Sequence, residues 1–287
     1  MTLPKYLYHY TSQAGLLGIL QTKKLWMTNI LYLNDSSEFT HTLDLVRSEV
    51  TKYKDLQINK GIRAYRPDEK NFTIDEKIYD VCEDIENYFH NFSENIGSES
   101  YIFSLSIDGN DLNQWRGYCS EGGFSIGFDT TKLSSIIDKN KTDYEIVKCI
   151  YDTGRKEELI KSTFDLIQTL FESDKKMSIV DVSMGVCTKI IIISPYIKHE
   201  SFKDEQEYRI ICQYIDRKKE YREGKSMVIP YIEFSPVDNN GLLPINKIFV
   251  GPTPHPELSK LSVENLLKSE KYKGVKVETS KIPYRSW

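Results

Sequence analysis

The segment Tyr8-His9-Tyr10-Thr11 combines an imidazole, two phenol rings and a hydroxyl in four residues. We expect it to end a short strand, because Ser12, directly after it, is a good helix N-cap. An imidazole N–H and a threonine hydroxyl can bond ribose hydroxyls, and a flat tyrosine ring can stack on a base or on nicotinamide. The alternative is a strand end at which the histidine bonds a neighbouring carbonyl and the tyrosines pack.

A second polar and aromatic segment, Gln114-Trp115-Arg116-Gly117-Tyr118, lies in a predicted short helix. A guanidinium held by aromatic neighbours can bind a phosphate or a carboxylate. A core tryptophan beside a structural arginine explains the same pattern without any ligand.

The third candidate is Glu205-Gln206-Glu207-Tyr208-Arg209, at the start of a predicted strand. Glu205 and Glu207 are two residues apart, so their carboxylates share one face, which Arg209 continues. One carboxylate can stabilise a cationic transition state or activate a nucleophile. The alternative is a solvated ladder of ion pairs, which is the usual role of a run of charges.

Asn34, Asp35, Glu38 and His41 have a spacing that also occurs among metal ligands. Asp35 and Glu38 also have the spacing of a helix capping box, which explains them without an ion. The five cysteines are scattered and include no C-x-x-C pair, so we expect buried thiols and neither a zinc cage nor a redox pair. We therefore expect no resident metal.

Strands and helices follow one another irregularly along the chain. Strands are predicted over 7–11, 25–28, 101–106, 123–129, 144–151, 207–215, 228–234, 247–250 and 275–280. Helices are predicted over 12–22, 111–118, 130–138, 156–172, 176–193 and 256–269. Because regular crossover helices do not separate the strands, the pattern favours an α+β fold over a doubly wound sheet. We expect a single domain over residues 1–287, with a mainly helical insertion at about 36–95.

The composition excludes several classes of protein. With 38 basic and 42 acidic residues the net charge is −4, which is not the charge of a protein that coats duplex nucleic acid. The longest apolar run, Ile190–Ile193, is far shorter than the ~18 to 20 residues of a membrane span. The first residues also lack the pattern of a secretory signal, so we expect a cytoplasmic protein.

Together these segments resemble a large bacterial family of uncharacterised proteins. The motifs that carry the resemblance are spread over nearly the whole chain: Leu7–Ser12, Leu33–Asp35 with Glu38, Gln114–Tyr118, Glu205–Arg209 and Ser280–Arg285. The start of the chain, a strand ending in histidine followed by a capped helix and a second strand, is also similar to the ADP-ribosyltransferase fold, found in DarT-type DNA-modifying toxins and in the poly-ADP-ribose polymerases. That similarity implies a mixed, mainly antiparallel sheet core.

The resemblance to the transferase fold implies that NAD is the substrate. His9 would bond the adenosine ribose, with Thr11 nearby. Tyr10, Tyr32 or Tyr118 would stack on nicotinamide. The protein would then be an NAD-dependent mono-ADP-ribosyltransferase that modifies single-stranded DNA, RNA or a protein, as a toxin or phage-defence effector.

The same resemblance assigns the charged residues. Glu207 would hold the nicotinamide ribose and offset the positive charge as the glycosidic bond breaks, although Glu205 competes for this role. Trp115 would be one of the cofactor-binding residues. Arg116, next to it, would bind the pyrophosphate or orient the acceptor. Two other functions stay open. One is a non-catalytic nucleotide-binding module, in which Glu207 serves only an ion pair. The other is a nuclease with Asp35, Glu38, Glu205 and Glu207 around Mg²⁺.

Overall fold

The chain divides into two compact units. The computed structural model describes residues 2–33, 38–62, 72–90, 100–119, 122–139, 143–174, 176–213 and 218–284. The sheet unit comprises Met1–Asn29, Tyr101–Cys149 and Lys203–Trp287, and the helical unit comprises Ile30–Ser100 and Ile150–Phe202. Each unit is therefore built from chain segments that are distant in sequence. Whether the two form a single domain, as we expected, stays a prediction.

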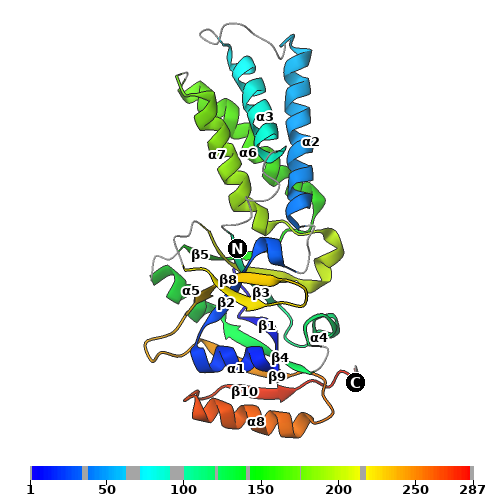
Figure 1. Cartoon of the computed structure of the whole chain (residues 1–287), viewed down its shortest axis with the longest axis vertical. Helices are drawn as coiled ribbons and strands as arrows, with labels where there is room; N and C mark the ends of the chain where they lie inside the picture. Colours follow the sequence, from blue (N-terminus) through cyan, green and yellow to red (C-terminus); the bar gives the residue numbers. More distant parts are fainter. Residues whose placement is uncertain are drawn as a thin grey trace. The chain divides into compact units, whose positions relative to one another are not determined.

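The sheet unit is built on a mostly antiparallel sheet (Figure 1). Its strands are β1 (Tyr6–Ser12), β2 (Leu25–Asn29), β3 (Tyr101–Ser106), β4 (Gly123–Asp129), β5 (Tyr144–Lys148), β6 (Glu207–Cys212), β7 (Glu220–Glu223), β8 (Val228–Phe234), β9 (Ile245–Val250) and β10 (Lys276–Thr279). In the described part of the chain they run in the order β10-β9-β4-β1-β3-β2-β8-β7, with β6 paired to β3 and β5 to β6. β9 and β10 are parallel, and the other pairs are antiparallel. The predicted α+β class is confirmed.

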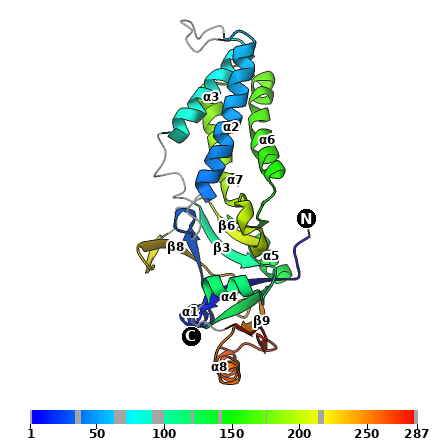
Figure 2. The same cartoon turned by 90° about the vertical axis from the view of Figure 1, so that its right-hand side faces the viewer.

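Helices cover parts of this sheet. They are α1 (Gln13–Thr22), α4 (Leu112–Tyr118), α5 (Thr130–Lys139) and α8 (Pro256–Ser269). α1 and α4 contact β1, α5 contacts β4 and β5, and α8 lies along β9 and β10 (Figure 2). The predicted cap of α1 is confirmed, because Ser12 Oγ accepts a hydrogen bond from the Gly15 N–H at 3.2 Å. The core between these elements includes Leu7, Phe128 and Ile210.

Strand β3 lies where the sheet splits. One of its edges pairs with β6 along the whole strand, from Tyr101 opposite Cys212 to Ser106 opposite Glu207. It also pairs with two other strands, each over a short stretch. β2 reaches only the first residues of β3, and β1 only the last, with Tyr8 opposite Ser106. β1 and β2 therefore separate from β3 along its middle, and this opening positions the site described below.

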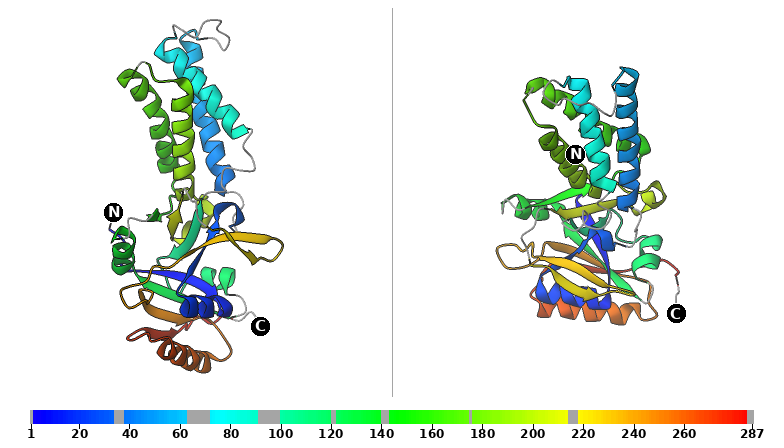
Figure 3. Two further views of the ribbon diagram at one scale, coloured as in Figure 1. Left: turned by 60° about the vertical axis from the view of Figure 1, so that its left-hand side comes forward. Right: turned by 45° about the horizontal axis from the view of Figure 1, so that its top comes forward.

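The helical unit is a group of four long helices that run side by side (Figures 1 and 3). They are α2 (Glu38–Asn59), α3 (Ile74–His90), α6 (Thr153–Ser173) and α7 (Ile179–Ile193), with the short turns η1 (Ile30–Tyr32) and η4 (Ser194–Tyr196) at their ends. Fully buried Ile85, Phe164, Phe171 and Ile190 fill their common core. The helical segment that we predicted at 36–95 supplies only α2 and α3, and the other two helices come from a second part of the chain.

Helix α7 is the most apolar element. By length and composition, Ile179–Tyr196 alone among the described segments could cross a membrane, with a mean hydropathy of 1.5, and 44% of it is buried in the structure. Our sequence analysis missed this segment because it counted only uninterrupted apolar runs. Since Val182, Val186 and Ile190 of α7 belong to the core of the helical unit, the helix has the pattern of a core helix.

Candidate functional site

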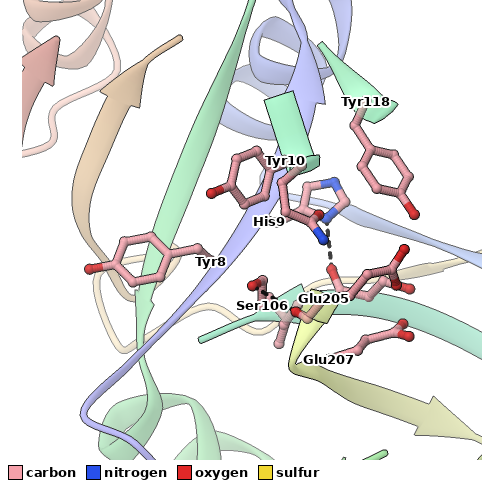
Figure 4. Close-up of a pocket in the computed structure, with 10 residues that line it drawn as sticks. Tyr8, His9, Tyr10, Ser106, Tyr118, Glu205 and Glu207 are labelled. Carbon is pink, nitrogen blue, oxygen red and sulfur yellow. Dashed lines mark hydrogen bonds between the residues drawn. The ribbon is translucent and has the colours of Figure 1, made fainter. Parts of the chain in front are cut away.

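A pocket opens in the sheet unit at the split beside β3 (Figure 4). It is lined by Tyr8, His9, Tyr10, Ser104, Leu105, Ser106, Gln114, Tyr118, Glu205 and Glu207. Its empty volume is about 360 Å³, including the part open to solvent. Because this volume includes open solvent, the enclosed part of the pocket is smaller, and it can hold only part of a dinucleotide.

His9 bridges the split with its side chain. Its Nδ1 donates a hydrogen bond to the carbonyl of Ser104 at 2.9 Å, and its ring stacks on Phe103 with centroids 4.1 Å apart. Burial lowers the pKa of His9 to about 4, although the bond to the Ser104 carbonyl acts in the opposite direction. The imidazole is therefore neutral at physiological pH, with its proton on Nδ1. Nε2 is left as an acceptor for a ligand hydroxyl.

Glu207 is held in place by a buried arginine. Arg209 donates from Nε to Oε1 and from Nη2 to Oε2, both at 3.0 Å, and the Cys149 thiol lies 3.7 Å from Oε2. Glu207 and Arg209 are 4% and 0% exposed, so this is a buried two-point ion pair and not the solvated ladder that was the alternative. The pair fixes the direction of the carboxylate that lines the pocket.

Glu205 reaches the same pocket from the turn before β6. It is the last residue of η5 (Glu200–Glu205), it is partly exposed, and its carboxylate points toward His9 and Tyr118 in Figure 4. The Ser106 hydroxyl donates to its backbone carbonyl at 3.0 Å. Gln206 has a φ of 44°, in the left-handed region that most residues avoid. This strained residue lets two glutamates from consecutive elements line one pocket.

Helix α4 contributes Gln114 and Tyr118, which are four residues apart and so share one face of the helix. Gln114 is buried, whereas Tyr118 is 40% exposed, so its ring can serve as a lid at the rim. Our sequence analysis kept Tyr118 but left Gln114 out of the site. The signal that could have found it is this four-residue spacing. The alternation of Ser104 and Ser106 with apolar neighbours could likewise have found the serines of β3.

Arg116 does not line the pocket. It lies two residues from Gln114 on α4, on the opposite side of the helix, and its guanidinium carbon is 5.3 Å from the centroid of the Tyr284 ring. Arg116 is thus not among the residues that line this pocket with His9 and Glu207, and its role as a ligand of the pyrophosphate or the acceptor stays a prediction. The site described here leaves Arg116 out.

Two other predicted ligand residues, Trp115 and Tyr10, have packing contacts. Trp115 is fully buried and donates from Nε1 to the Asn110 side chain at 3.0 Å. Tyr10 packs edge-on against it, with centroids 4.7 Å apart, and its hydroxyl donates to the Asp108 carbonyl at 2.8 Å. Tyr10 borders the pocket, but its buried ring has no open face for stacking. Thr11 is not among the lining residues.

Two further tyrosines are less well placed to cover a ligand. Tyr32 is in the helical unit and is not among the residues that line the pocket. Tyr8 does line it, but in Figure 4 its ring extends away from the two glutamates, and it packs near Phe249 with centroids 6.0 Å apart. Tyr118 is therefore the aromatic side chain best placed to cover a ligand.

The charge of the lining indicates what the pocket can hold. In the described part of the chain its walls carry two carboxylates and neither Lys nor Arg. Arg209 offsets one of these charges from behind the wall. Such a pocket favours a cationic group and disfavours a phosphate.

No metal centre is seen among the described residues, where no group of three or more His, Cys, Asp or Glu side chains is placed to hold an ion. Asn34, Asp35 and the side chain of Glu38 lie outside the described residues, so that part of the metal interpretation is not tested. Nε2 of His41 lies 3.1 Å from Nζ of Lys156, within hydrogen-bonding distance.

Comparison with known proteins gives one match. A model of the family described as a protein of unknown function, DUF2971, matches residues 114–210, about a third of the chain. The matched segment includes four lining residues, Gln114, Tyr118, Glu205 and Glu207, but not strand β1 with His9. No curated protein and no solved structure matches the chain.

Proposed function

We propose that this pocket binds the nicotinamide ribose half of NAD and that the protein transfers ADP-ribose from NAD to a macromolecule. The proposal rests mainly on one observation. His9, from the first strand, and Glu205 and Glu207, from about two thirds along the chain, line one pocket at the split of a mainly antiparallel sheet. The resemblance to the transferase fold implies His9, Arg116 and Glu207 in one cleft, and the pocket holds His9 and Glu207, with Glu205 in addition and Arg116 outside its lining.

The chemistry of the pocket fits the cationic half of the dinucleotide. Nicotinamide in NAD carries a positive charge, and breaking its bond to ribose moves positive charge onto the sugar. The bonding electrons leave with nicotinamide, while a nucleophile of the acceptor bonds to the sugar carbon and loses its proton. The carboxylates of Glu205 and Glu207 offset the charge that develops on the ribose.

His9, Tyr118 and Ser106 would then position the substrate. Nε2 of His9 accepts a hydrogen bond from a ribose hydroxyl, and the exposed ring of Tyr118 covers the nicotinamide. Only the nicotinamide ribose half is assigned to the pocket, whose empty volume of about 360 Å³ includes space open to solvent. This role for His9 differs from the adenosine contact that we first expected.

The test is transfer of label from NAD to a lysate or to nucleic acid, together with release of free nicotinamide. Glu205→Gln keeps the shape of a partly exposed side chain and should lower nicotinamide release by at least about 100-fold, which corresponds to ~2.7 kcal/mol of transition-state stabilisation. Arg116→Ala is the matched control, since Arg116 lies outside the pocket, and should retain the wild-type rate. Equal losses in both variants would contradict the assignment.

A second function has its own support. Because both oxygens of Glu207 are engaged by Arg209, the carboxylate could serve packing alone, and the pocket would then bind a nucleotide without reaction. This module would bind NAD saturably, with no release of nicotinamide and no transfer of label. The Mg²⁺ nuclease has no comparable support in the described residues. Activity as a toxin or in phage defence stays a prediction.

A further inference from the structure

An exposed aromatic stack lies on the sheet unit, apart from the pocket. Trp26 of β2 and Tyr231 of β8 stack with centroids 4.5 Å apart and an interplanar angle of 30°. Tyr231 is 7% exposed, whereas Trp26 is 44% exposed. Tyr231 is therefore the lower ring, and the indole above it has a face open to solvent. An open indole face supported from below is a platform on which another flat ring can stack.

Among the described residues, no anionic partner is seen for a guanidinium beside this stack. Arg222 of β7 donates from Nη2 to Thr28 Oγ1 at 3.1 Å, while its Nε is buried without a hydrogen-bond partner in the part of the chain that the structure describes. Burial lowers the pKa of Arg222, and Tyr231 is the group that opposes the shift. A partly buried guanidinium with an unused hydrogen-bond donor is stabilised by a phosphate or a carboxylate placed against it.

The stack of Trp26 and Tyr231, the guanidinium of Arg222 and the pocket lie on one face of the sheet. Residues opposite each other in antiparallel strands point to the same side, as do residues two apart in one strand. The residues that continue this face from β6 across β3, β2 and β8 to β7 are Glu207, Ser106, Ile102, Thr28, Tyr231, Glu220 and Arg222. Trp26 is two residues from Thr28 and so belongs to it as well.

The separation from the pocket has the scale of a short oligonucleotide. Trp26 and Glu207 are two strand spacings and about two residues apart, which is at least about 12 Å, because β2 and β3 are no longer paired at Trp26. A length of about 12 Å corresponds to roughly two to four nucleotides, at ~3.4 Å each in a stacked strand and more in an extended one.

We infer that Trp26, Tyr231 and Arg222 form a binding site for single-stranded nucleic acid. Trp26 and Thr28, the contact of Arg222, are ~7 Å apart along β2, which suits a base on the indole and an adjacent phosphate on the guanidinium. A duplex hides the faces of its bases, and the net charge of −4 does not favour duplex coating. The carboxylates near the stack, Glu220 and Glu233, are paired with lysines and so do not repel the strand strongly.

Binding at this surface is independent of any reaction in the pocket. Only the further step, that the bound strand is the acceptor of ADP-ribose, rests on the proposed function. If single strands bind but nicotinamide is never released, the transferase proposal fails and this site stands. If nicotinamide is released but no strand binds, the reverse holds.

The experiment is fluorescence anisotropy of labelled 12-nucleotide single-stranded DNA and RNA, and of the matching duplex, titrated with the full chain. We expect at least one single strand to bind more tightly than the duplex. Trp26→Ala should weaken that binding roughly 5- to 150-fold, the range for loss of one stacked base. Trp26→Phe should lose less, because a ring remains. Arg222→Gln should weaken binding and reduce its salt dependence.

The matched control is Tyr221→Ala. Tyr221 is 65% exposed and lies next to Arg222, but on the opposite face of β7, so its removal should leave the affinity unchanged. Thermal melting of each variant checks that it is folded. The inference is overturned if no single strand binds, if the duplex binds equally well, or if folded Trp26→Ala and Trp26→Phe keep the wild-type affinity. Those outcomes would leave a protein interface as the explanation of the exposed stack.

Discussion

The buried pair of Glu207 and Arg209 makes a quantitative prediction about stability. Two charge-assisted hydrogen bonds of 3.0 Å join them, and neither residue is more than 4% exposed. Removing one partner takes these two bonds from the buried charge of the other, which costs about 3 to 5 kcal/mol. The same figure follows from two hydrogen bonds to charged groups at ~1.5 to 3 kcal/mol each. Arg209→Met and Glu207→Gln should each lower the free energy of unfolding by this amount.

Replacing both residues should cost much less than the sum of the single changes. Apolar side chains of similar size often substitute for a buried ion pair at little net cost. We therefore expect Glu207→Met with Arg209→Met to be within ~2 kcal/mol of wild type, which gives a coupling energy of several kcal/mol in the double-mutant cycle. Urea unfolding followed by tryptophan fluorescence is a suitable assay, since Trp26 and Trp115 both report on the sheet unit.

The reasoning is refuted if Arg209→Met alone unfolds within about 1 kcal/mol of wild type, or if the cycle shows no coupling. The result also affects the interpretation of activity. Glu207→Gln should lower stability as well as activity, because a neutral amide cannot balance Arg209. Glu205→Gln is the cleaner variant for activity, since Glu205 is partly exposed.

Three smaller predictions concern residues around the pocket. The pKa of His9 falls from 6.5 in the unfolded chain to about 4 in the fold, so its contribution to stability is fully present above pH ~6.5 and is lost as the pH falls to ~4. The contribution of His9 to the free energy of unfolding is at most ~3 kcal/mol. Between pH 4 and 6.5 the free energy of unfolding should therefore change less with pH in His9→Asn than in the wild type. Tyr10→Phe leaves the Asp111 N–H without its acceptor, at 2.8 Å from the hydroxyl, and should cost ~1 to 3 kcal/mol in urea unfolding. Gln206→Gly relieves a positive φ of 44° and should keep or raise the melting temperature, whereas Gln206→Val should lower it; equal melting temperatures would argue against strain at this turn.

Local signals in the sequence predicted most of the elements. Ser12 and Asp111 each cap the helix that follows them, and both caps act through contacts within three residues. Strand β7 (Glu220–Glu223) was missed because its four charged and aromatic residues carry no apolar alternation. The division into two units was also missed. It depends on pairing between segments distant in sequence, such as β3 with β6, which no local pattern specifies.

The site was predictable only in part. His9 and Glu207 were assigned from the resemblance to the transferase fold, and both line the pocket. Arg116 was included because a guanidinium between aromatic neighbours can bind a phosphate, and it does not line the pocket. The helical period instead sends Gln114 and Tyr118 to the pocket and Arg116 away from it. Trp115 is a core residue. A large aromatic side chain at a contact between a strand and a helix is buried by packing, so its ring is not available to a ligand.

The most direct test of the central claim is calorimetric titration of the full chain with NAD. We expect saturable binding that His9→Ala weakens about 5- to 10-fold, the effect of one lost hydrogen bond of ~1 to 1.4 kcal/mol, and that Arg116→Ala leaves unchanged. Absence of binding, or a loss of affinity in Arg116→Ala but not in His9→Ala, would contradict the assignment of this pocket to NAD.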